Sequence, residues 1–203
     1  MTRPRATRRI RHGSASEGAV FVRHSYTRSR DTARAGLRYY QMRPRGEGEP
    51  PRSLFTKEGA VSRDEAYRLM DTHQARGYLA HRLILSPADG EQPEDLRELT
   101  RHLMAELAKE KGMALHWIAV EHHNTDHPHV HIVLCGGGED GNGTVHEIRL
   151  DRDDHARLRE DGWEYCRTEA RERTRWETML ARAAAMDDRG RDAPRGTRDD
   201  HDR

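Results

Sequence analysis

The clearest feature of the sequence is a stripe of leucines at helical spacing. Residues three or four apart lie on one face of a helix, and four leucines follow this rule between positions 96 and 107. The stripe consists of Leu96, Leu99, Leu103 and Leu107. It predicts a core-facing helix that begins near Pro93 and stops at Gly112, because glycine readily closes a helix in the left-handed conformation.

Three other segments show weaker helix signals. Residues 62–65 have the pattern of a capping box, so a helix is expected to begin at Ser62 and end near Gly77. Residues 31–41 have apolar positions compatible with a helix. The acidic run that starts at Asp151 is suited to cap a last helix, which is expected to reach position 173 or beyond.

Short apolar runs between these segments predict strands. Residues 114–121 and 128–136 are the strongest, and residues 78–85 form a third. Weaker runs at 19–22 and 144–150 complete the set, the latter returning from a glycine-rich turn. This order indicates an α/β fold of the α+β type, with an antiparallel central sheet and helices largely on one face.

The composition sets limits on the domain organisation. The 203 residues suit one domain with tails, and only 33% of them are hydrophobic while 35% are charged. We therefore expect a disordered basic arm over residues 1–18, a folded domain over 19–180 and a disordered charged tail over 181–203. Two cysteines without metal-like spacing are consistent with a reducing cytoplasm, and no apolar run predicts a membrane span.

Charge is distributed unevenly along the chain. Residues 1–45 hold 12 Lys and Arg but only two acids, Glu17 and Asp31, whereas the remainder is net acidic. A basic arm on an acidic body favours a polyanionic partner that touches one face. An unfolded, arginine-rich tail that only aids solubility would give the same pattern.

Residues 122–131 contain five histidines. His129 and His131 are two apart on a predicted strand, so both imidazoles project from one face while Val130 faces the other way. His122 ends the preceding strand, and a hairpin would bring it beside the other two. Three neutral imidazoles bind a divalent metal ion and leave coordination positions open.

A pair of histidines on a strand is by itself as often structural as functional. The number of histidines in this segment, beside strongly apolar strands, favours a metal site. His123 and His127 are interpreted as facing solvent or DNA.

The motif His122-x-Asn-Thr-Asp-His-Pro-His-Val-His131, followed by Ile-Val-Leu, resembles the third motif of conjugative relaxases, which are transfer nucleases of the HUH endonuclease superfamily. Two more segments resemble the plasmid mobilisation branch: Ala33-Arg-Ala-Gly-Leu-Arg-Tyr-Tyr-Gln41 and Tyr78-Leu-Ala-His-Arg-Leu-Ile-Leu-Ser-Pro87. The three occur in the family's order over roughly residues 30–150. The histidine motif is highly specific and the tyrosine segment moderately so.

The resemblance implies a palm-like sheet of about five strands and a tyrosine nucleophile on an N-terminal helix. Tyr39 matches this nucleophile, with the adjacent Tyr40 as a backup or core residue. His122, His129 and His131 match the metal ligands, for Mg²⁺ or Mn²⁺ first and for Zn²⁺, Co²⁺ or Ni²⁺ as further candidates. The implied reaction nicks single-stranded DNA at a transfer origin and leaves a 5′-phosphotyrosine.

Further residues and partners follow from the same resemblance. Asn124 and Asp126 are candidates to orient the ligand histidines, although the family often has an acid at the first of these positions. Five arginines near the tyrosines are expected to hold DNA phosphates, with a solvated helix face as the alternative. They are Arg28, Arg30, Arg34, Arg38 and Arg43. Accessory mobilisation proteins, a coupling protein and a monomeric state are also expected.

Three other functions fit parts of the sequence. A rolling-circle replication initiator or transposase of the same superfamily would use the same chemistry. A DNA-binding accessory protein would use the metal for structure only. A three-histidine zinc hydrolase would let water attack in place of tyrosine.

Overall fold

The computed structural model describes residues 20–43, 50–88, 93–123 and 127–191. The chain divides into two compact units, Met1–Cys166 and Arg167–Arg203. Helix α4 (Arg152–Arg191) begins in the first unit and extends beyond the predicted domain end at residue 180. The predicted arm at 1–18 and the last part of the predicted tail, 192–203, lie outside the described residues, so the domain boundaries stay predictions.

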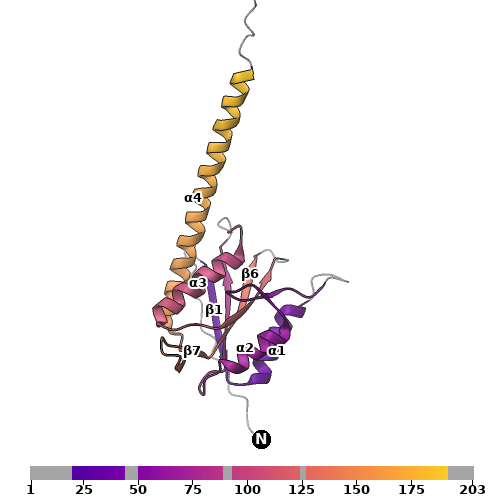
Figure 1. Cartoon of the computed structure of the whole chain (residues 1–203), viewed down its shortest axis with the longest axis vertical. Coiled ribbons are helices and arrows are strands. Elements are labelled where there is room, and N and C mark those ends of the chain that lie inside the picture. Colours follow the sequence, from indigo (N-terminus) through magenta and orange to yellow (C-terminus); the bar gives the residue numbers. More distant parts are fainter. Residues whose placement is uncertain (1–19, 44–49, 89–92, 124–126, 192–203) are drawn as a thin grey trace, which may run out of the picture. The chain divides into compact units, whose positions relative to one another are not determined.

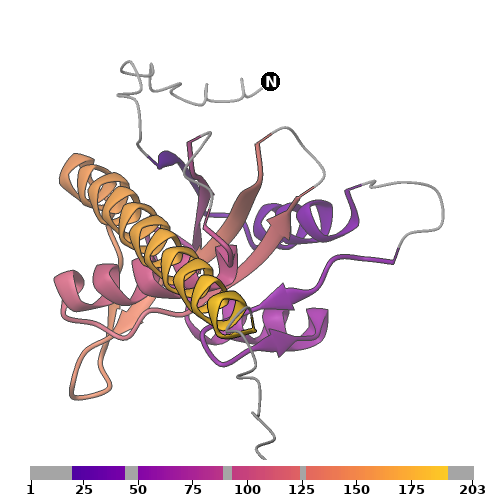
Figure 2. The same cartoon turned by 90° about the horizontal axis from the view of Figure 1, so that it is seen from above.

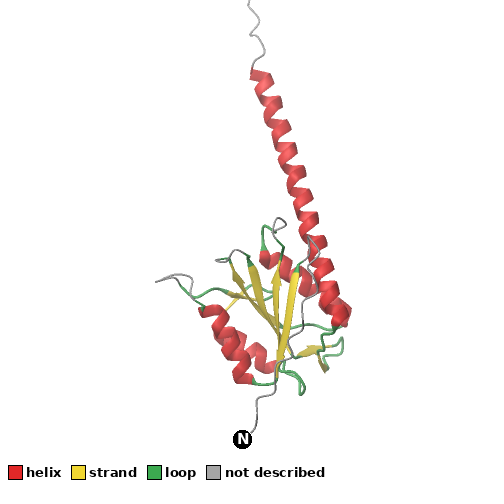
Figure 3. Cartoon of the chain, turned by 180° about the vertical axis from the view of Figure 1, so that it is seen from behind, coloured by secondary structure: helices red, strands yellow, loops and turns green. Residues whose placement is uncertain are grey.

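Six strands form one antiparallel sheet in the order β1-β4-β6-β5-β2-β3 (Figure 3). In this order they are β1 (Phe21–Thr27), β4 (Ala80–Ser86), β6 (His129–Cys135), β5 (Trp117–His122), β2 (Leu54–Phe55) and β3 (Ala60–Val61). The three adjacent strands β4, β6 and β5 correspond to the predicted runs at 78–85, 128–136 and 114–121. The sequence thus predicted the antiparallel centre of the sheet correctly.

The central sheet agrees with the prediction of about five antiparallel strands, but its edges contain short strands that the sequence did not predict. β2 and β3 are two residues each, which is too short for apolar alternation to reveal. β1 extends to Thr27, well beyond the predicted 19–22. The prediction stopped short because the later residues of this strand are largely polar and continue no apolar run. The run at 144–150 does not return to the main sheet: β8 (Val145–Glu147) pairs with β7 (Gly137–Glu139) in a separate two-stranded sheet.

Helices cover both faces of the sheet, so the expectation that they lie largely on one face is wrong. α1 (Arg30–Met42) and α2 (Arg63–Thr72) pack on one face, and α3 (Leu96–Lys111) with the first part of α4 packs on the other (Figures 1 and 2). The physical reason lies in β5, where four successive residues from Trp117 to Val120 are all buried. A strand that is apolar on both faces needs helices on both.

The helix ends follow the expected capping chemistry. Ser62 caps α2 and exchanges hydrogen bonds with Glu65, as a capping box requires. This helix ends at Thr72 rather than near Gly77. Asp95 caps α3, and Gly112 closes it with a φ of 62° as predicted.

Candidate metal and nuclease site

Three histidines meet where β5 ends and β6 begins. His122 lies directly opposite His129 in the register of the hairpin, and His131 shares the face of His129 two residues further on. One ring nitrogen from each can be chosen so that all lie within 4.8 Å of one another. The ring centroids are 4.6–5.1 Å apart. The structure therefore brings together the three residues that the sequence proposed as ligands.

Backbone hydrogen bonds leave a lone pair free on two of these rings. The Nε2 of His122 donates to the carbonyl oxygen of Tyr40 over 2.9 Å, so in the neutral ring Nδ1 carries no proton. The Nδ1 of His129 donates to the carbonyl of His127 over 2.9 Å, which leaves Nε2 unprotonated. Fixing the tautomer through the second ring nitrogen is the usual way in which proteins orient a ligand histidine.

His131 gives the strongest sign that the trio is built for a cation. Both of its ring nitrogens are buried and find no hydrogen-bond partner among the described residues, and the same holds for His122 Nδ1. Leaving such a polar atom unsatisfied costs about 1–3 kcal/mol. A divalent cation would satisfy His122 Nδ1 and the unprotonated nitrogen of His131, so the donor set fits the metal that the sequence implied.

Two of the three histidines, His122 and His131, are kept neutral by their surroundings. Burial, with help from nearby His122 and His129, lowers the pKa of His131 to about 3. Burial also lowers the pKa of His122 to about 4. Near neutral pH these two rings therefore offer lone pairs rather than positive charge, which is what coordination requires.

The two candidate tyrosines lie near the end of α1 in different surroundings. The ring of Tyr40 stacks on His131 with 4.0 Å between centroids and 11° between planes. Burial raises the pKa of Tyr40, and the charges of Arg82 and Arg23 partly offset this effect. Tyr39 is 59% exposed, and its ring centroid lies 6.0 Å from that of Tyr40. α1 thus presents one tyrosine against the histidines and the next to solvent.

Three of the five predicted phosphate-binding arginines are engaged within the protein. Arg30 and Arg34 both pair with Asp71, the latter over 2.5 Å. The Nε of Arg28 donates to the carbonyl of Gly77 over 2.8 Å. The other two, Arg38 and Arg43, are exposed near the end of α1. The structure therefore leaves Arg38 and Arg43 as the more available cations.

Sequence reasoning missed other arginines near the histidines. Arg23 pairs in register with Ile84 of β4, which in turn pairs with His131, so Arg23 shares the sheet face of the trio. Arg82 lies two residues from Ile84 on this same face, and buried Arg52 is close enough to lower the pKa of His122. For Arg23 and Arg82, only the strand register shows this relation. Asn124 and Asp126 lie outside the described residues.

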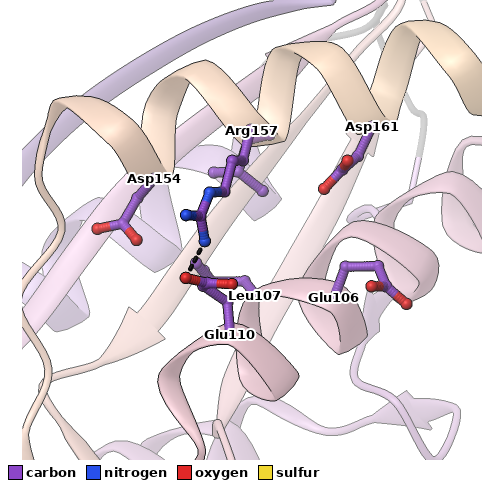
Figure 4. Close-up of a pocket in the computed structure, with 7 residues that line it drawn as sticks. Glu106, Leu107, Glu110, Asp154, Arg157 and Asp161 are labelled. Carbon is purple, nitrogen blue, oxygen red and sulfur yellow. Dashed lines mark ion pairs between the residues drawn. The ribbon is translucent and has the colours of Figure 1, made fainter.

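A hollow elsewhere in the first unit is chemically unsuited to DNA. It lies between α3 and the first turns of α4 and is lined by Glu106, Glu110, Asp154 and Asp161 (Figure 4). Arg157 pairs with Glu110, which leaves the lining net acidic. Phosphates would be repelled there, so the histidine trio is the candidate site.

Comparison with known proteins identifies the family. The model of the MobA/VirD2-like relaxase nuclease domain matches residues 54–162. The chain belongs to this family. The matched part of this relaxase contains the three candidate ligands His122, His129 and His131 but begins after Tyr39 and Tyr40. Membership supports a relaxase-type DNA-nicking function.

Solved structures support the fold of the relaxase. One, described as "Molecular Basis of Vancomycin Resistance Transfer in Staphylococcus aureus", is 15% identical with a TM-score of 0.50, and the match covers 76% of this chain and 93% of that one. At this identity the likeness shows the fold alone. No curated protein matches the chain. Within the described part of the relaxase, no helix combines the length and apolar character that a membrane crossing needs.

Proposed function

We propose that this relaxase nicks single-stranded DNA at a transfer origin and stays joined to the cut strand through Tyr39. One observation carries the proposal: three buried or half-buried histidines place one ring nitrogen each within 4.8 Å of the others, beside the helix that bears the tyrosine. A metal site, a phenol and arginines in one place suit phosphodiester chemistry better than any one of them alone.

His122, His129 and His131 would hold the divalent cation. Mg²⁺ and Mn²⁺ are our first candidates, although imidazole ligands also suit Zn²⁺, Co²⁺ and Ni²⁺. When bound, the cation would neutralise the oxygens of the phosphodiester and lower the barrier to attack. Neutral imidazoles leave the full charge of the ion available for this task.

Tyr39 supplies the nucleophile in this proposal. Its phenol oxygen forms a bond to phosphorus while the bond from phosphorus to the 3′ oxygen breaks, giving a 5′-phosphotyrosine and a 3′-hydroxyl that takes up the phenol proton. No water enters, so the energy of the phosphodiester is kept for rejoining. Tyr39 is favoured because a strand can reach an exposed phenol, whereas Tyr40 is half-buried, stacked on His131 and has a raised pKa.

Arginines around the site would hold the strand. Arg38 and Arg43 lie near the end of α1, and Arg23 and Arg82 lie on the sheet face of the histidines. Guanidinium groups bind backbone phosphates without reading the bases. In our proposal the relaxase acts as a monomer, with accessory mobilisation proteins and a coupling protein as partners.

An adduct assay tests this function. The full chain is incubated with single-stranded oligonucleotides that carry candidate transfer origins and with Mn²⁺ or Mg²⁺, and a denaturing protein gel is then run. We expect a slower protein band that carries DNA, that disappears with EDTA and that is absent in Tyr39→Phe. Tyr40→Phe is the matched control, because it removes the neighbouring hydroxyl from the same helix, and it should retain the band.

Other outcomes would support other functions. A band kept in Tyr39→Phe and lost in Tyr40→Phe would contradict our choice of nucleophile. Cleavage without any adduct would indicate a water-using hydrolase. Binding without cleavage on all substrates would indicate an accessory protein. An adduct that forms only on replication or transposon origins would indicate a replication initiator or a transposase rather than a transfer relaxase.

A further inference from the structure

A second cluster of metal-binding side chains lies near the other end of β5. His73, His116 and Glu139 each offer one ligand atom, and these atoms all lie within 4.8 Å of one another. His73 follows the last residue of α2, His116 precedes β5, and Glu139 ends β7. The exposed fractions of their side chains are 13%, 16% and 35%, so the cluster is largely enclosed.

One carboxylate oxygen of Glu139 approaches a ring nitrogen of each histidine. The Oε1 of Glu139 lies 3.1 Å from Nδ1 of His73 and 3.8 Å from Nε2 of His116. These two nitrogens are nevertheless buried and have no hydrogen-bond partner in the described part of the chain. One carboxylate and two ring nitrogens that converge in this way are poorly satisfied by each other, and a cation between them would remove the conflict.

The two imidazoles are stacked, which also calls for an explanation. Their centroids are 3.4 Å apart and their planes differ by 10°. Face-to-face stacking is an unfavourable arrangement for two aromatic rings. An imidazole lone pair lies in the ring plane, so binding an ion requires the rings to open from this stack. Rotation about the last side-chain torsion of histidine is broad enough to allow it.

We propose that His73, His116 and Glu139 form a second metal site that takes a divalent transition cation, with Zn²⁺ as the best fit. Two imidazoles and one carboxylate are a ligand set found at zinc sites, where water fills the remaining position. Two charged residues outside the set, Lys57 and Glu58, act on His116 with opposite sign, and they pair with each other over 3.4 Å, so they add little net charge.

Backbone hydrogen bonds hold the segments that carry the three side chains next to one another before any ion binds. Glu139 and Ala114 exchange two backbone hydrogen bonds of 2.7 and 3.1 Å, and the N–H of Gly137 donates to the carbonyl of His73 over 2.9 Å. An ion bound to all three side chains would therefore fasten the β7–β8 hairpin to α2 and to the start of β5. Ion binding would then have to order only the side chains, since the backbone segments are already joined.

The proposed site is separate from the histidine trio. His116 precedes β5 and His122 ends it, and six residues of extended strand span about 20 Å. The two sites share no residue. Each can therefore be removed without touching the ligands of the other, and the failure of one proposal is distinguishable from the failure of the other.

Metal stoichiometry tests the second site. Metal-free full-length protein is titrated with Zn²⁺ by calorimetry, and bound zinc is counted after gel filtration. The wild type should bind two ions, the His73→Ala/His116→Ala variant one, and the His122→Ala/His131→Ala variant one. Glu139→Gln keeps the shape of the side chain and should lower the zinc affinity of the second site by at least about 10-fold. Changing a residue that only supports a metal ligand already lowers affinity by about this much, and Glu139 is proposed as a ligand itself.

The control variant is His146→Ala. His146 lies on the same hairpin, is exposed and pairs with Asp140 over 2.9 Å, so its loss should leave two ions bound. If the His73→Ala/His116→Ala variant does not fold, Glu139→Gln decides the question. The proposal is overturned if Glu139→Gln binds zinc with wild-type stoichiometry and affinity, or if the wild type binds one ion that the His122→Ala/His131→Ala variant loses.

Discussion

The two faces of β6 carry out different tasks with alternating residues. Val130, Ile132 and Leu134 face the apolar core under α3, whereas His129 and His131 face α1. On the α1 side, the apolar packing around Val133 gives way to histidines at one end of the strand. A single strand thus anchors the fold with one set of side chains and presents metal ligands with the other. Stability and catalysis should therefore respond to different, neighbouring mutations.

The largest expected effect comes from the ligand face. His131→Ala removes one of three imidazoles, so adduct formation should fall by about 100-fold or more at saturating Mn²⁺. The metal-free protein should lose little stability, because the variant also removes two buried nitrogens that lack partners among the described residues. Adduct yield against time and urea unfolding with EDTA measure the two quantities. Full activity in the variant would contradict the assignment of His131.

The next effect comes from the adjacent residue on the opposite face. Ile132 is completely buried in the core under α3, so Ile132→Ala should lower the free energy of unfolding by about 2–5 kcal/mol. The fraction that remains folded should form the adduct at the normal rate. The same urea and adduct assays apply. A loss of activity in fully folded Ile132→Ala protein would mean that the two faces are not separable.

The smallest effect comes from the arginines of α1, where Arg38 is exposed and Arg30 is paired with an acid. Arg38→Ala should weaken binding of single-stranded DNA and lower the salt dependence by about 0.7 in the slope of log K against log salt. Arg30→Ala is the matched control and should change the slope less, because Arg30 already pairs with Asp71. Fluorescence anisotropy at several salt concentrations measures both. A larger change of slope in Arg30→Ala than in Arg38→Ala would mean that Arg30, and not Arg38, contacts the DNA phosphates.

The sequence predicted the parts of the molecule that depend on local pattern. The leucine stripe of α3, the capping box at Ser62 and the position of His122 beside His129 and His131 all follow from spacing, and the structure contains each of them. The arrangement of helices on both faces was not predicted, although the unbroken apolar run in β5 carried that information.

Relations that depend on register or on distant contacts could not be predicted. Arg23 and Arg82 join the histidine face only through the pairing of β1, β4 and β6. The engagement of Arg30 and Arg34 with Asp71 needs α2 beside α1. His73, His116 and Glu139 are far apart in sequence and show no motif, so only the folded chain brings their side chains together.

The most direct test of the account is to locate the covalent bond between the relaxase and DNA. The adduct is formed with Mn²⁺, its DNA is trimmed by nuclease, and the protein is digested with trypsin and sequenced by tandem mass spectrometry. We predict a phosphonucleotide on Tyr39, present only when Mn²⁺ is added and absent from the His122→Ala/His131→Ala variant. A phosphonucleotide on Tyr40 or any other residue, or an adduct that forms without the histidines, would contradict the account.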